Sequence, residues 1–239
     1  GDDLWIGTYT GGVNVLNTKT GVFRVYTTKA GDPTTLDRSS SYAIFKDREA
    51  RIWVTSMSGV NLYNREEDNF TRIRDLGSWI MDIDQDADGN IWFSSQGNGL
   101  FKYDPDKQEW TNYVHSNAPG ALINDQVNCV LIDGNGEMWI GTMNGLCKYN
   151  AKEDQFELIP LDIPSSNICA IIEDQRVLWL TTTKGLVRYA PGESCQVFTR
   201  SDGLQSEQFL VNAALKASDG KIYIGSVNGF NAFYPYQIK

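Results

Sequence analysis

The chain has 239 residues, of which 41% are hydrophobic and 12% aromatic, so it can bury a large core. Its formal net charge of −9 argues against a nucleic-acid-binding surface, which needs clustered lysine and arginine. The single histidine leaves no material for a multi-histidine metal site and almost none for a Ser-His-Asp triad.

One short motif recurs along the chain: an aromatic residue between two aliphatic ones, followed by glycine or hydroxyl residues. Its first copy is Leu4-Trp5-Ile6-Gly7-Thr8, and successive aromatic positions lie 39–48 residues apart. The six aromatic residues are Trp5, Trp53, Trp92, Trp139, Trp179 and Tyr223. A regular period of this length indicates a repeat architecture.

Each repeat contains four predicted strands, which we name a to d in chain order. Strand a is a short apolar run that mostly ends in an acid, expected at Tyr42–Asp47, Trp79–Asp84, Val127–Asp133, Ile168–Asp174 and Val211–Ala217. A turn rich in Asp, Gly and Asn follows and leads into strand b, which carries the aromatic motif. Strand c opens on a glycine, and strand d alternates with polar residues. Strand b is apolar at consecutive positions, so both of its faces should be buried, and we expect Trp53, Trp92, Trp139 and Trp179 to lie in the core.

Four antiparallel strands per repeat predict an all-β fold, a β-propeller of four-stranded blades. We expect about 22 strands, almost no helix, and one propeller segment over residues 1–239. The chain starts at a strand b and ends after a strand c, which corresponds to about five and a half blades. We therefore expect a fragment of a longer protein whose complete ring has seven blades.

Four cysteines, Cys129, Cys147, Cys169 and Cys195, form no C-x-x-C pair and fall within predicted strands. Buried free thiols are the favoured interpretation, with one disulfide as the alternative.

Residues Val127–Tyr149, "VNCVLIDGNGEMWIGTMNGLCKY", resemble the two-component regulator propeller repeat almost throughout. The C-terminal run "SDGLQSEQFLVNAALKASDGKIYIGSVNGFNAFYPYQI" resembles the last blade of such regions. The resemblance implies a periplasmic sensor that recognises an oligosaccharide, followed by an Ig-like domain, a transmembrane helix and a histidine kinase. It further implies a membrane-anchored parent chain, neighbouring propeller and Ig-like domains as partners, and a homodimer as one arrangement.

Two motifs invite a metal or catalytic interpretation. Asp84-Gln85-Asp86-Ala87-Asp88-Gly89 matches the first half of a calcium loop, but Ser95 stands where a bidentate acid is needed, so a hairpin turn is favoured. His115 follows strand d in a loop, and we expect a surface residue, with ligand contact as the alternative. We predict no catalytic residue, metal or cofactor.

In a propeller the b-to-c and d-to-a connections emerge on one face, where ligands usually bind. Trp79 breaks the repeat pattern at the start of an innermost strand, beside two long d-to-a connections. A large aromatic side chain there offers a stacking surface for a sugar ring, and core packing is the alternative. The candidate ligand residues are Trp79, Tyr9, Tyr42, Asn98, Asn144 and His115.

A ligand-sensing propeller without catalysis of its own is therefore the favoured function. Its rivals are a propeller enzyme, such as a lyase or glycosidase, and a protein-interaction scaffold. The enzyme would need acids or histidines outside the repeat positions, and the scaffold would need an exposed apolar patch.

Overall fold

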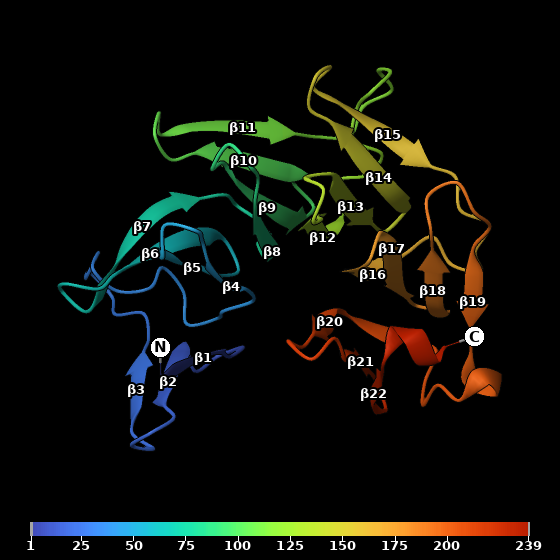
Figure 1. The fold of residues 1–239 in the computed structure, drawn as a ribbon. Coiled ribbons are helices and arrows are strands. Elements are labelled where there is room, and N and C mark those ends of the chain that lie inside the picture. Colours follow the sequence, from blue (N-terminus) through green and yellow to red (C-terminus); the bar gives the residue numbers. More distant parts are fainter. Residues whose placement is uncertain (1, 239) are drawn as a thin grey trace. The chain divides into compact units, whose positions relative to one another are not determined.

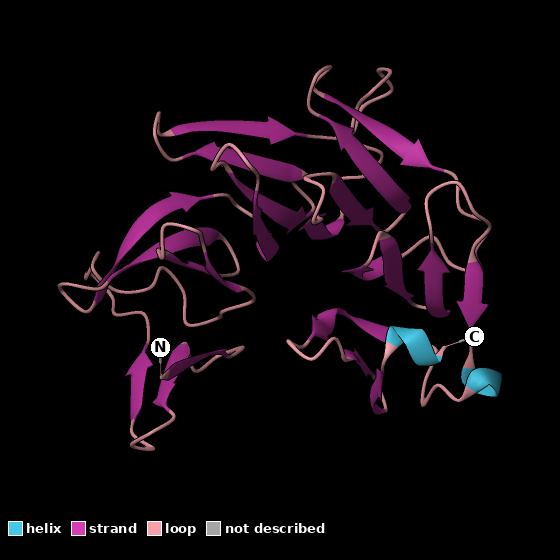
Figure 2. Cartoon of the chain, viewed as in Figure 1, coloured by secondary structure: helices cyan, strands magenta, loops and turns pink. Residues whose placement is uncertain are grey.

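Residues 2–238 are described by a computed structural model, in which the fold is all-β (Figures 1 and 2). These residues form 22 strands and two short 3-10 helices, η1 (Arg200–Asp202) and η2 (Pro235–Gln237). The predicted number of strands and the near absence of helix are confirmed. No helix within residues 2–238 is long and apolar enough to cross a membrane.

The strands form six antiparallel sheets, each built from strands consecutive in the chain. The chain divides into two compact units, and the sequence boundary between them falls after Trp110, within β11. The first unit holds the three-stranded sheet β1 (Asp3–Gly7), β2 (Val13–Asn17) and β3 (Phe23–Tyr26), and two four-stranded sheets. These are β4 (Ile44–Lys46), β5 (Ile52–Thr55), β6 (Gly59–Asn64) and β7 (Asn69–Asp75), then β8 (Trp79–Gln85), β9 (Ile91–Gln96), β10 (Leu100–Asp104) and β11 (Glu109–Tyr113).

The second unit contains two four-stranded sheets and one of three strands. The four-stranded sheets are β12 (Val127–Ile132), β13 (Met138–Thr142), β14 (Gly145–Asn150) and β15 (Gln155–Ile159), then β16 (Ile168–Asp174), β17 (Val177–Thr182), β18 (Gly185–Tyr189) and β19 (Gln196–Phe198). The last sheet is β20 (Phe209–Lys216), β21 (Ile222–Ser226) and β22 (Gly229–Phe233). The propeller thus has six blades of three or four strands. The expected count of about five and a half blades is not confirmed, and a seven-bladed parent ring stays a prediction.

Burial follows the predicted order across a blade. Strands β5, β9 and β13 are buried along nearly their whole length, whereas the outer strands β11 and β15 are largely exposed. The four tryptophans expected in the core are each at most 2% exposed: Trp53, Trp92, Trp139 and Trp179. Both expectations are confirmed.

Glycine opens strand c because neighbouring backbone leaves no room for a side chain. Gly12 has a φ of +73°, and a Cβ there would lie 1.9 Å from the Tyr26 carbonyl oxygen. Gly185 has a φ of +115°, with the Phe198 carbonyl oxygen 2.6 Å from the same position. The glycine therefore lets the b-to-c turn close tightly against strand d.

A Tyr–Asp–Tyr bridge links neighbouring blades at one point in each unit. In the first unit, Tyr26 from β3 and Tyr63 from β6 both donate to Asp68 at 2.5 Å. These two hydrogen bonds hold the pKa of Asp68 below its usual range. In the second unit, Tyr113 and Tyr149 donate to Asp154 at 2.7 and 2.5 Å. Asp68 and Asp154 have φ values of 54° and 53°, so both bridges use the same left-handed turn.

None of the four cysteines forms a disulfide within residues 2–238. Cys129, Cys147 and Cys169 are buried in strands, as expected. Cys195 differs from the prediction because it lies just before β19 and is only half-buried.

Candidate ligand site

Three of the predicted ligand residues form one aromatic cluster in the first unit. The rings of Tyr42 and Trp79 are stacked, with centroids 5.9 Å apart and an interplanar angle of 16°. Tyr9 meets Tyr42 edge to face at 6.4 Å. Trp79 is 42% and Tyr9 65% exposed, so the cluster reaches solvent rather than filling the core. We call Tyr9, Tyr42 and Trp79 the aromatic cluster.

Each member of the aromatic cluster is placed by a different blade. Tyr9 lies in the b-to-c turn of the first blade, which the Thr8 amide closes by donating to the Gly12 carbonyl at 3.0 Å. Tyr42 precedes β4, and its amide donates to the Thr55 carbonyl. Trp79 is the first residue of β8 and pairs with Gln96.

The long connection between β3 and β4 is fixed to the second blade by Asp37. One carboxylate oxygen accepts from the hydroxyl of Ser56 at 2.7 Å, and the other accepts from the side-chain amide of Asn61 at 2.6 Å. The Asp37 amide also donates to Asn61 Oδ1 at 3.0 Å. This network holds the connection that leads into Tyr42. Sequence reasoning missed it, although an acid within a connection otherwise rich in Ser and Thr was an available signal.

Tyr42 contributes an unused polar group to the aromatic cluster. Its phenolic oxygen is buried and has no hydrogen-bond partner among residues 2–238. Burial, and then the neighbouring Tyr9, raise the pKa of Tyr42. The phenol therefore stays protonated at neutral pH and remains a hydrogen-bond donor.

The other predicted ligand residues have different surroundings. Asn98 donates its side-chain amide to the Leu76 carbonyl at 3.0 Å and so supports the short connection that precedes Trp79. Asn144 is exposed in the second unit, with its amide bonded to Thr142 Oγ1. His115 is exposed in the same unit, and its Nδ1 lies 2.9 Å from the Leu122 carbonyl oxygen. The structure thus brings Tyr9, Tyr42 and Trp79 together, with Asn98 supporting the connection to Trp79.

The acidic stretch at 84–89 forms a hairpin turn, in which Asp86 accepts a hydrogen bond from a tryptophan indole. Asp86 accepts from the indole of Trp92 at 2.7 Å and from the amide and side chain of Asn90. Asp47 and Asp133 accept from the indoles of Trp53 and Trp139 in the same way, at 2.8 and 3.0 Å. Residues 2–238 contain no group of three or more His, Cys, Asp or Glu side chains arranged to hold a metal ion.

Asp174 also ends a predicted strand a, but it does not accept from the indole of its tryptophan, Trp179. It ends β16 opposite Val177 and forms an ion pair with Lys216 at 2.8 Å. Between equivalent strand pairs, this hairpin has four residues, 174–177, whereas that of the preceding blade has five, 133–137. In the shorter hairpin Asp174 joins the strand pairing, and the Trp179 indole N–H has no partner among residues 2–238.

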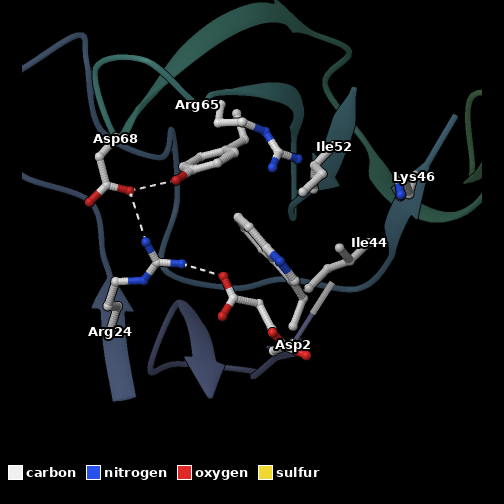
Figure 3. A pocket seen from close by; sticks show the side chains of 10 residues that line it. Asp2, Arg24, Ile44, Lys46, Ile52, Arg65 and Asp68 are labelled. Atoms are coloured by element: carbon white, nitrogen blue, oxygen red, sulfur yellow. Dashed lines mark hydrogen bonds and ion pairs between the residues drawn. The ribbon is translucent and has the colours of Figure 1, made fainter. Parts of the chain in front are cut away.

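A cavity of about 670 Å³ lies in the first unit (Figure 3). Trp5 and Tyr63 line it together with three acids and three bases, Asp2, Asp3, Asp68, Arg24, Lys46 and Arg65. Arg24 joins Asp3 at 2.7 Å and Asp68 at 3.6 Å across the cavity wall. None of the predicted ligand residues lines it.

Residues 121–144 match the family model described as "Two component regulator propeller". The chain is also 30% identical over 220 residues to Histidine kinase P4 of Formosa agariphila, an alignment that covers 68% of this chain. The chain spans only 16% of the length of that protein.

Solved structures share the fold. The extracellular domain of a proposed hybrid two-component system from B. thetaiotaomicron superimposes with a TM-score of 0.80 at 24% identity, covering 97% of this chain and 32% of that one. PorZ of Porphyromonas gingivalis, described as a bacterial surface component of the type-IX secretion system, gives 0.74 at 17% identity, covering 97% of this chain and 37% of its own.

Some structures with this fold are enzymes. Streptogramin B lyase has a TM-score of 0.72 at 11% identity, with 97% of this chain and 79% of the lyase covered. Identities this low establish the shared architecture alone, so function has to be argued from the site. At the level of the repeat the relationship is specific: residues 121–144 are a two-component regulator propeller repeat, and the family resemblance predicted from the sequence is confirmed.

Proposed function

We propose that this chain is the ligand-sensing propeller region of a two-component receptor and that it recognises an oligosaccharide through the aromatic cluster. The observation that carries the proposal is the contact of Tyr9, Tyr42 and Trp79, which come from three blades and leave Trp79 42% exposed. Flat aromatic faces beside polar groups suit a sugar, which presents apolar C–H faces and hydroxyl edges.

The surroundings of the aromatic cluster support recognition rather than catalysis. Tyr42 supplies an unpaired hydroxyl, and the Asp37 network holds the adjoining connection. The one histidine, His115, belongs to the other unit. We therefore assign the chain a binding role without catalysis of its own.

In this proposal the receptor lies with its propeller in the periplasm. Ligand binding is relayed through an Ig-like domain and a transmembrane helix to a histidine kinase. The extracellular two-component domains that share the fold support this placement, as does the histidine kinase relative.

The test is a calorimetric titration of the protein with a panel of oligosaccharides. Trp79→Ala should weaken binding of the sugar that responds by about tenfold or more, because it removes the stacking surface. The melting temperature should change little, since Trp79 is partly exposed. Tyr236→Ala is the matched control, because Tyr236 is 78% exposed and lies in the other unit. Equal affinities of wild type and Trp79→Ala would remove the aromatic cluster from the proposal.

A further inference from the structure

The hairpin at 175–176 differs from its counterparts in ways that affect its surroundings. Asp174 pairs with Val177, so only Gln175 and Arg176 form the turn, with φ values of 52° and 70°. Two-residue hairpins of type I′ need positive φ at both positions and therefore favour Asn and Gly. The chain instead places two long polar side chains there, at a cost in backbone strain.

A cavity of about 610 Å³ lies beside this hairpin in the second unit. The hairpin lines one side through Gln175 and Arg176, and the preceding blade lines another through Asp133, Asn135 and Glu137. Arg188 of β18 completes the polar wall. The volume falls in the range of small-molecule sites, roughly 300–1,000 Å³.

The carboxylates that line this cavity already have hydrogen-bond or ion-pair partners within the protein. Asp133 accepts from the Trp139 indole and from the amides of Asn135 and Glu137. Glu137 is paired with Lys148. Glu193 is the nearest acid to Arg188, at 3.9 Å, the outer limit of an ion pair.

The two guanidinium groups are, by contrast, poorly paired. The Arg176 side chain has no ion pair or hydrogen bond among residues 2–238, and only its backbone amide is bonded, to Glu173. Arg188 has the long contact with Glu193 and a side chain 33% exposed. Guanidinium groups bind carboxylates through paired N–H···O bonds, so two arginines with so little pairing at one cavity suit a ligand with a carboxylate.

We propose that the cavity beside the 175–176 hairpin binds a carboxylate-bearing small molecule through Arg176 and Arg188. Gln175 and Asn135 stand beside them with amide groups that suit ligand hydroxyls. This site belongs to the second unit and is independent of the aromatic cluster, whose three residues lie in the first.

The test is a calorimetric titration with glucuronate, acetate and glucose. Glucuronate should bind, and acetate should bind more weakly at the same site. Glucose, which has the sugar ring without the carboxylate, should give no measurable heat. Arg176→Gly and Arg188→Gln should each weaken glucuronate binding by about tenfold or more.

Two controls make the result specific. Arg200→Gln changes an exposed arginine of the same unit that does not line the cavity, and it should retain wild-type affinity. Tyr236→Ala should also retain it, because Tyr236 is exposed and does not line this cavity. Arg176→Gly relieves a positive φ, so it should fold at least as well as wild type and its loss of binding would not reflect unfolding. The proposal fails if neither carboxylate binds, if glucose binds as well as glucuronate, or if both arginine variants keep wild-type affinity.

Discussion

The turns before Trp139 and Trp179 show what one residue contributes to a repeat: seven residues separate Trp139 from its strand partner Leu131, and six separate Trp179 from its partner Ile172. Before Trp139, residues 133–137 form a turn whose Asp133 accepts the buried indole N–H at 3.0 Å. Before Trp179 the turn is only Gln175-Arg176, and the buried Trp179 N–H has no partner among residues 2–238. Both tryptophans are equally buried, at 2% and 1% exposed. Burial of the ring is therefore set by strand b, whereas satisfaction of its N–H is set by the turn.

The two repeats also differ in the basic residue that lies across the sheet from the tryptophan ring. Lys148 faces Trp139 across β13 and β14 and lies 5.2 Å from the ring centroid. Arg188 has the same cross-strand position opposite Trp179 but reaches toward Glu193 and the cavity wall. In the repeat of Trp139, the indole N–H and the cation opposite the ring both have partners within the repeat. In the repeat of Trp179, the indole N–H has no partner among residues 2–238, and Arg188 has only a long contact with Glu193.

The largest expected effect is common to both repeats. Trp139→Ala and Trp179→Ala should each lower the free energy of unfolding by about 3–5 kcal/mol, the usual loss for a large buried aromatic side chain. Trp139→Ala should lie at the upper end because it also leaves Asp133 without its indole donor. Chemical denaturation with one spectroscopic probe measures both. A Trp139 variant of wild-type stability would show that the repeat tryptophans are not the core of their blades.

Much of this fold was predictable because the same residue types recur at the same positions of each repeat. The spacing of the aromatic motif gave the blade strands, and the apolar run of strand b gave the burial of Trp53 and Trp92. Recurrent turn acids gave the hairpins, because carboxylates at Asp86 and Asp133 receive local donors. Such features depend on neighbours within one repeat.

Other features depend on contacts between blades and were not predictable in that way. The Asp37 network joins a connection to residues 19 and 24 positions away, and the Tyr26–Asp68 bond spans 42 positions. The altered role of Asp174 was visible in principle, because it lies five residues before its tryptophan, whereas Asp47, Asp86 and Asp133 each lie six residues before theirs. Of the candidate site, the sequence supplied Tyr9, Tyr42 and Trp79 but not their mutual contact.

A smaller effect should separate the two indole N–H groups. Trp139→Phe and Trp179→Phe both remove the N–H and part of the ring, so their packing losses should be similar. Trp139→Phe also breaks the bond to Asp133, whereas Trp179→Phe removes a donor that is already unpaired. We expect Trp139→Phe to cost about 1–2 kcal/mol more. Equal losses measured by denaturation would indicate that Trp179 finds an acceptor in solution.

An effect of opposite sign should follow from restoring ordinary turn chemistry. The double variant Gln175→Asn, Arg176→Gly places the preferred residues of a two-residue hairpin at two positive-φ positions. It should raise the free energy of unfolding by about 1 kcal/mol, since left-handed backbone is unfavourable for residues with a side chain. A rise in melting temperature, together with loss of glucuronate binding, would show that the native hairpin residues serve the cavity rather than stability. A fall in melting temperature would mean that Gln175 or Arg176 stabilises the blade.

The smallest effect concerns one buried cysteine in each of the two blades, Cys147 and Cys169, whose thiols should titrate and react alike. Burial raises the pKa of Cys147 in β14 and of Cys169 in β16 to about 11, against an ordinary value of 9.0. At pH 8 the thiolate fraction of each is then about a thousandth, so an aromatic disulfide reagent should modify neither in the folded protein, whereas half-buried Cys195 should react first. Because the folded pKa lies above the unfolded one, the stabilisation from the two protonated thiols is complete below pH 9 and is lost as the pH rises through 11. Replacing either cysteine with alanine should therefore reduce the fall in unfolding free energy between pH 9 and 11. Rapid labelling of Cys169 but not Cys147 at pH 8 would show that the shortened hairpin loosens the interior of its own blade as well as its surface.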